Sequence, residues 1–198
     1  MKHLNGHLLC VVDTEVTGLI PGKHEIFEIC ILPLNAKLEV SREHLPFNIK
    51  IKPEKTEDIA WEVLNVTQTS FMELCNTGMD KWEAADLFVS WYEKLDLPNN
   101  KRICPLAHNW VFDKPFIQDW LGFAEFNLRF DGRYRDTMSL ALAINDHHDS
   151  RNEPCPFPKC NLSYLAATLK IDYDKIHTAL DDCVLTTKVY KELIYKKY

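Results

Sequence analysis

The chain has 198 residues, which is enough for one domain with a sizeable core and short for two. Hydrophobic residues make up 46% and charged residues 26%, as in ordinary globular proteins, and no apolar run approaches the roughly 20 residues that span a bilayer. The net charge of −6 argues against a protein that grips nucleic acid mainly through a basic surface. It does not argue against an enzyme that meets phosphate through bound divalent cations. We therefore predict a single domain over residues 1–198, with a cytoplasmic location and no membrane contact.

The first part of the chain has the patterns of β-strands. Residues 8–13 (LLCVVD) form an apolar run that ends in an acid, which is typical of a strand buried on both faces. Residues 25–34 predict a second strand after a turn rich in glycine and proline. Residues 45–51 alternate and contain Pro46, which favours a third strand toward a sheet edge.

Helical periodicity dominates the rest of the chain. A helix is predicted over residues 56–66, and Asp80 can cap another over residues 81–95. Short strands are predicted at residues 103–108 and at 134–137. Further helices are predicted over residues 113–121, 139–144, 162–169 and 178–195. This order predicts an α/β domain with one central mixed sheet of five strands, flanked by helices.

Several aromatic residues fall at core spacing on the predicted helices. They are Trp61, Trp82, Phe88 and Trp91, and we interpret them as packing residues and not as a stacking platform for bases.

Residues 147–159 are polar and rich in proline, which predicts a surface loop. Cys155 and Cys160, with His147 and His148 upstream, could supply four zinc ligands. The Cys-x4-Cys spacing lacks a second cysteine pair, so a solvated loop with two incidental thiols is the favoured interpretation. The chain has seven cysteines, an odd number, and we expect them to be reduced.

Three segments place acids where a strand ends or a helix begins. Asp13 and Glu15 are two residues apart at the end of the first strand, so their side chains point to the same face. Asp113 follows the strand at residues 103–108. His177 precedes the acid pair at residues 181–182 by about one helical turn. Each feature alone is ordinary, because acids often cap helices or lie in turns. The three together form a pattern.

The order and surroundings of these acids resemble the DEDDh branch of the DnaQ-like exonucleases. The motifs of that branch are DxE(T)TG, HNxxFDxxF and HxAxxD, and this chain has DTEVTGL from residue 13, HNWVFDKPF from residue 108 and HTALDD from residue 177. The resemblance extends from about residue 8 to residue 192. It implies a ribonuclease H-like fold and a 3′–5′ exonuclease that releases 5′-mononucleotides from single strands.

The resemblance also implies the roles of individual residues. The metal-binding carboxylates are Asp13, Glu15, Asp113 and Asp182. Together they would hold two divalent cations, and hard oxygen ligands suit Mg²⁺ or Mn²⁺. His177 is the implied general base. The HxAxxD spacing selects Asp182 over Asp181.

The resemblance also implies which residues contact the 3′ end of the nucleic-acid strand. Residues that border the terminal nucleotide are Thr17, Gly18 and Leu19, and Leu19 would pack on the base. Phe116 is a candidate to stack on the base, and Asn109 to bind the backbone. Val16 stands where the family commonly has threonine, so a hydroxyl contact to the 3′ terminus is lost or replaced. We expect altered affinity from this departure, and not inactivity.

Two other functions fit parts of the pattern. One is a non-catalytic domain on the same fold that binds nucleic acid or a protein, and the other is a hydrolase of small phosphate esters. The presence of all five site residues favours the exonuclease. The predicted partner is a single-stranded 3′ end, with DNA placed ahead of RNA, and a polymerase or repair complex is a further candidate. A role in proofreading, repair or RNA processing, and the oligomeric state, stay open.

Overall fold

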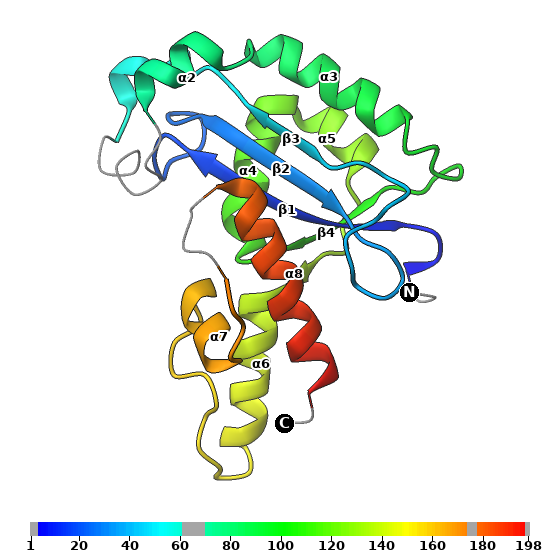
Figure 1. The fold of residues 1–198 in the computed structure, drawn as a ribbon, viewed down its shortest axis with the longest axis vertical. Coiled ribbons are helices and arrows are strands. Elements are labelled where there is room, and N and C mark those ends of the chain that lie inside the picture. The colour runs from blue at the N-terminus through cyan, green and yellow to red at the C-terminus, as the bar shows by residue number, and fades with distance from the viewer. Residues whose placement is uncertain (1–3, 61–69, 174–177, 197–198) are drawn as a thin grey trace.

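The computed structural model of the chain describes residues 4–60, 70–173 and 178–196. Its centre is a five-stranded sheet in the order β3-β2-β1-β4-β5 (Figure 1). The strands are β1 (Leu8–Val16), β2 (Ile26–Pro33), β3 (Phe47–Lys50), β4 (Ile103–Ala107) and β5 (Arg135–Asp136). The first three pair antiparallel, and β1, β4 and β5 run parallel. The mixed five-stranded sheet that the sequence predicts is confirmed.

The central strand β1 is longer than its apolar run indicates. It continues through Asp13 and Glu15 to Val16, so both acids lie within the strand and not after it. Every residue of β2 is buried, as expected for an inner strand. β3 lies at the sheet edge, where Pro46 immediately before it removes no inner-strand hydrogen bond.

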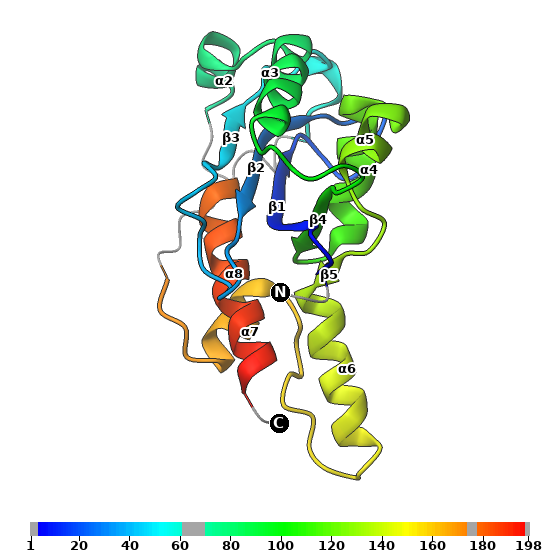
Figure 2. The ribbon, with the colours of Figure 1, turned by 90° about the vertical axis from the view of Figure 1, so that its right-hand side faces the viewer.

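Helices cover both faces of the sheet (Figure 2). The helices α3 (Lys81–Glu93), α4 (Trp110–Leu121) and α5 (Phe123–Arg129) pack against one face in a shared core with Val12 and Ile29. The long helix α8 (Ala179–Tyr195) covers the other face. The helices α6 (Thr137–Asp149) and α7 (Leu162–Thr168) pack on α8. In the described part of the chain, no helix is both long enough and apolar enough to cross a membrane.

Some predicted boundaries are wrong. The helix α6 runs to Asp149, so His147 and His148 lie in its last turn and the predicted loop begins only after it. The helices α5 and α2 (Phe71–Thr77) were not predicted at all. Each has only seven residues, which is too short for clear periodicity. The expected helix at 56–66 begins as a short 3-10 turn, η2 (Thr56–Asp58), and its residues 61–66 lie outside the described part.

The aromatic prediction is correct only in part. Phe88 is fully buried in the core and Trp91 packs against that core. Trp82 is 65% exposed, so its interpretation as a core residue is wrong. The inward face of α3 is set by Ala84 and Phe88, and Trp82 stands in the first turn, off that face. Asp80 caps α3 as predicted, accepting hydrogen bonds from two backbone N–H groups. Trp61 lies outside the described residues.

Candidate active site

The alternation of β1 directs two carboxylates toward α8. Leu9 and Val11 pack in one core with Cys183 of α8. Side chains two residues apart on a strand share a face. Asp13 and Glu15 therefore continue this row, beyond the point where apolar packing ends.

The first turn of α8 adds a third carboxylate. One ligand oxygen from each of Asp13, Glu15 and Asp182 lies within 4.8 Å of the other two, and no other group of three such ligands occurs among the described residues. The neighbouring Asp181 serves the helix cap instead. The Thr178 hydroxyl accepts from the Asp181 backbone N–H at 3.1 Å and donates to the Asp181 carboxylate at 2.6 Å. The two adjacent acids therefore make different contacts: Asp182 lies in the carboxylate cluster and Asp181 binds the helix cap.

The fourth carboxylate, Asp113, comes from the first turn of α4 and is buried. Thr14 holds it, because its backbone N–H and its hydroxyl donate to Asp113 Oδ1 at 3.0 Å and 2.7 Å. Thr14 points away from the face that carries Asp13, so one strand places two acids directly and positions a third through its other side. The charge of Asp113 acts on Asp13, which puts all four acids in one neighbourhood.

Burial and mutual repulsion disfavour ionisation of these acids. Burial raises the pKa of Asp13 well above its usual range, and the charges of Asp113, Glu15 and Asp182 raise it further. Burial also raises the pKa of Glu15 to about 8. The pKa of Asp113 is raised by burial to about 7, although the Thr14 hydrogen bonds oppose the shift. Such a set of hard oxygen donors fits a divalent cation, whose charge would favour the ionised forms.

Glu28 is a site neighbour that the sequence interpretation missed. It is buried in β2 and pairs across strands with Glu15 on one side and Lys50 on the other. Burial raises the pKa of Glu28, while Lys50 and a hydrogen bond from the Ala179 backbone N–H lower it. Glu28 therefore connects β2 to the start of the helix that carries Asp182. An acid inside an apolar run was the available signal, because a buried acid needs a partner.

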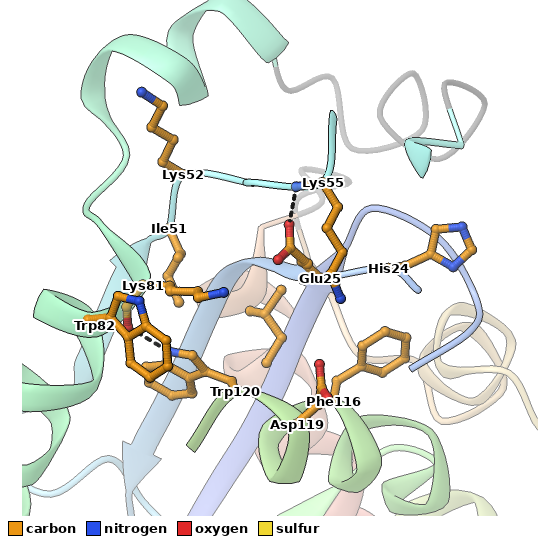
Figure 3. A pocket seen from close by; sticks show the side chains of 11 residues that line it. His24, Glu25, Ile51, Lys52, Lys55, Lys81, Trp82, Phe116, Asp119 and Trp120 are labelled. Atoms are coloured by element: carbon orange, nitrogen blue, oxygen red, sulfur yellow. Dashed lines mark hydrogen bonds between the residues drawn. The ribbon is translucent and has the colours of Figure 1, made fainter. Parts of the chain in front are cut away.

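Residues 17–25, here called the site loop, join β1 to β2 and border a cleft (Figure 3). The loop contributes His24 and Glu25 to the cleft, and α4 contributes Phe116 and Trp120. Basic residues that line it are Lys52, Lys55 and Lys81. Glu25 does not join the carboxylate cluster. One oxygen of its carboxylate accepts hydrogen bonds from the backbone N–H groups of residues 54 and 55, at 2.8 Å and 2.7 Å.

The residues predicted to contact the 3′ end of the nucleic acid differ in how exposed they are. Leu19 is 70% exposed, whereas Thr17, Gly18 and the Val16 side chain are buried. Val16 thus offers a ligand no side-chain polar group. Phe116 is only 2% exposed and packs on Phe112, with ring centroids 5.3 Å apart, so little of its ring is open to a base.

Two further residues were predicted to belong to the site, Asn109 and His177. Asn109 occupies the N-cap position of α4 in the left-handed conformation, with a φ of 69°, makes no side-chain capping hydrogen bond and is half-buried. His177 lies outside the described residues, directly before the Thr178 cap. Its role as general base stays a prediction.

The alternative zinc site receives no geometric support. His148 Nδ1 lies 3.2 Å from Glu153, Cys155 Sγ lies 3.9 Å from the Asn145 carbonyl oxygen and Cys160 Sγ lies 3.6 Å from that of Phe157. These contacts close the turn after α6. The structure brings no three ligands of this segment together, within the residues it describes.

The fold is recognisable from this arrangement. A mixed sheet of this order with helices on both faces is a ribonuclease H-like domain, and acids of β1, α4 and α8 lie together at one end of it. An exonuclease family model, RNase T, matches residues 10–190. The chain belongs to this family, within the DEDDh superfamily of metal-dependent 3′–5′ exonucleases.

Individual relatives are distant. An oligoribonuclease of Coxiella burnetii is 26% identical over 134 residues, which cover 66% of this chain and 70% of the relative. E. coli exonuclease I in a zinc-bound complex with single-stranded DNA is 17% identical, with a TM-score of 0.73 over 93% of this chain and 40% of that one. The nuclease domain of 3′hExo, a DEDDh family member bound to rAMP, is 16% identical, with a TM-score of 0.69 over 94% of this chain and 91% of that one. At these identities the solved structures show the fold alone, and this chain spans about 40% of the exonuclease I chain.

Proposed function

We propose that the chain hydrolyses the last phosphodiester bond at the 3′ end of a single strand and releases 5′-mononucleotides one at a time. The observation that carries the proposal is the convergence of Asp13, Glu15 and Asp182 within 4.8 Å, with Asp113 held beside them by Thr14. These four carboxylates are the proposed ligands of two divalent cations, Mg²⁺ or Mn²⁺. When bound, such a pair stabilises the charge on the attacking and leaving oxygens and on the phosphoryl group.

The remaining residues of the site bind and orient the strand. The exposed Leu19 side chain offers an apolar surface to the terminal base, beside Thr17 and Gly18. Asn109 is the proposed partner of the strand backbone. His177 is the proposed general base that takes the proton of the attacking water, since an unperturbed imidazole titrates at about 6.5.

The nature of the sugar is the finer part of the proposal. Single-stranded DNA is the first candidate, and complexes of the structurally similar exonuclease I contain it. Short RNA is the second candidate, and the likeness to an oligoribonuclease favours it. The choice depends on contacts near the 2′ position of the bound nucleotide. A polymerase or repair complex as partner, and a cytoplasmic location, stay predictions.

Digestion of matched labelled strands tests the proposal. Single-stranded DNA and RNA carrying a 5′ label should shorten stepwise with Mg²⁺, a 3′ label should leave first as a mononucleotide, and EDTA should stop both. Covalently closed circular strands should resist, since the reaction needs a free 3′ hydroxyl. Cutting of circles would contradict the exonuclease. Turnover of a mononucleotide ester at a rate equal to that of oligonucleotides would favour the hydrolase of small esters instead.

Replacement of the general base is the second test. The variant His177→Ala should keep the fold and most metal binding and lose roughly 10²–10⁴-fold in turnover, the usual range for such a group. The rise of the wild-type rate with pH through the titration of the histidine should disappear in the variant. Turnover near that of the wild type would mean that another group accepts the proton.

A further inference from the structure

The tip of the site loop exposes two apolar side chains a few residues after Glu15. Leu19 and Ile20 are 70% and 55% exposed, and Glu15 lies only a few residues before them at the end of β1. The exposed part of this apolar pair gains nothing from packing within the described chain. It offers an aliphatic surface against which the apolar face of a nucleobase can pack.

A buried histidine closes this loop from inside. The backbone N–H of Ile20 donates to His24 Nδ1 at 2.9 Å, and the backbone N–H of His24 donates to the Ile20 carbonyl oxygen at 2.8 Å. Only 7% of His24 is exposed. Because Nδ1 accepts a hydrogen bond, the proton of the neutral ring is on Nε2. His24 therefore holds Ile20, one of the two apolar residues at the tip, in place.

Gly18 provides the space for this ring. A Cβ atom on Gly18 would lie 2.3 Å from His24 Cδ2 and 2.5 Å from Nε2, distances at which atoms overlap. The glycine is thus required by close approach of the imidazole and not by a left-handed backbone. Gly18 and His24 form a matched pair, and any side chain at residue 18 would push the ring out of the loop.

The two ends of the loop are held by other bonds. Thr17 and Glu25 exchange two hydrogen bonds, from the Thr17 N–H to the Glu25 carbonyl oxygen at 2.8 Å and from the Glu25 N–H to the Thr17 hydroxyl at 2.9 Å. Lys55, which lines the cleft, donates from Nζ to the Gly22 carbonyl oxygen. With both ends tied, the position of the tip depends on the contact inside it.

We infer that His24 is a positioning residue that holds Leu19 and Ile20 as a preformed apolar platform for the terminal base of the strand. The inference rests on the proposed exonuclease function and adds to it the residue that shapes the base contact. A platform that is fixed before binding avoids the entropy cost of ordering a loop on each encounter. Loss of the lock should therefore weaken binding more than it slows the chemical step.

Two substitutions at one position test the lock. His24→Leu removes the hydrogen-bond acceptor and puts an apolar side chain of similar size in its place. It should raise KM for an oligonucleotide by about 5–10-fold, the usual effect of one lost hydrogen bond, with kcat nearly unchanged. His24→Asn should restore KM to within about twofold, because Oδ1 can take the place of Nδ1 as the acceptor. His147→Leu, at an exposed histidine in α6, is the matched control and should not change KM.

The lock also has a readout that needs no turnover. Amide hydrogen exchange at Ile20 should be slow in the wild type and in His24→Asn, and at least tenfold faster in His24→Leu. Gly18→Ala should act like His24→Leu, since it displaces the ring from the other side. Equal KM and equal Ile20 exchange in the Leu and Asn variants would overturn the inference. If the wild type digests no 3′ end, the proposed function fails, while the exchange experiment still decides whether His24 holds the tip.

Discussion

Asp181 and Asp182 are adjacent acids with different surroundings, and they form an internal control. Asp182 shares the carboxylate cluster, whereas Asp181 is bonded to the Thr178 cap. We expect Asp182→Asn to lower kcat by at least about 10³-fold, because a charged metal ligand is lost, and Asp181→Asn to lower it less than about fivefold. Rates of release of 3′-labelled nucleotides at saturating Mg²⁺ give the comparison. A larger loss in Asp181→Asn would mean that the motif spacing has selected the wrong acid, and equal losses would contradict the different roles assigned to the two acids.

Thr14 acts on the site through Asp113. The variant Thr14→Val keeps the backbone hydrogen bond and the β-branched shape but loses the hydroxyl that donates to Asp113 Oδ1 at 2.7 Å. We expect the concentration of Mn²⁺ that gives half-maximal activity to rise about 10–100-fold, the usual effect of losing a group that orients a metal ligand. Thr14→Ser restores a donor and should recover most of the affinity. An unchanged Mn²⁺ titration of Thr14→Val would show that the backbone bond alone holds Asp113.

The motif resemblance predicted the four acids but not the groups that contact them. Asp13, Glu15, Asp113 and Asp182 follow from motif order. Thr14 and Glu28 act across the sheet, on α4 and on the start of α8, and those contacts exist only once the elements are packed. A threonine in a strand is too ordinary a feature to predict such a role.

At the scale of elements, the ends of β1, α4 and α8 bring like charges together, and this has a consequence for stability. The pKa values of Glu15, about 8, and Asp113, about 7, are above the ordinary carboxyl value of about 4, so the folded state holds these protons more tightly than the unfolded state. The metal-free protein should therefore lose stability as pH rises from about 4 to about 8.

Divalent cations should remove this loss, because they bind the ionised carboxylates. At pH 8 and 100 times the dissociation constant, Mg²⁺ should raise Tm by about 5–10 °C, and by less at pH 5, where protons compete. Thermal unfolding with Mg²⁺ and with EDTA across this pH range measures both effects. A Tm in EDTA that rises steadily from pH 5 to pH 8 would contradict the assignment of the raised pKa values to the folded state.

The elements themselves were predictable in proportion to their length and burial. β1 and β2 stood out as apolar runs, and α3 and α8 as periodic segments with polar caps. The seven-residue helices α2 and α5 were missed. For α2 the sequence did contain a signal, because Ser70 precedes Glu73 by three residues and its hydroxyl accepts from the Glu73 N–H.

The end of α6 shows a different limit. Two histidines and two aspartates give residues 146–149 the composition of a loop, yet the helix continues through them. Tertiary contacts outweigh the local preference here: Asn145 binds the backbone of Phe157, whose buried ring packs in the core shared by α6, α7 and α8.

At the scale of the whole molecule, a net charge of −6 limits how the chain can hold a polyanion. A nuclease that bound its strand over a broad basic face would lose affinity steeply with salt, at about 0.7 logarithmic units per phosphate contact for single strands. If bound cations and a short loop hold only the 3′ end of the strand, about two to three phosphate contacts contribute to the salt dependence. We therefore expect log(1/KM) to fall with log[NaCl] with a slope between about −1 and −2 at fixed Mg²⁺. Measurements from 50 to 300 mM NaCl, with strands of 4 and of 20 nucleotides, check this expectation. The slope should be the same for both lengths, and a slope steeper than about −4 for the longer strand alone would place a second, extended binding surface on the molecule.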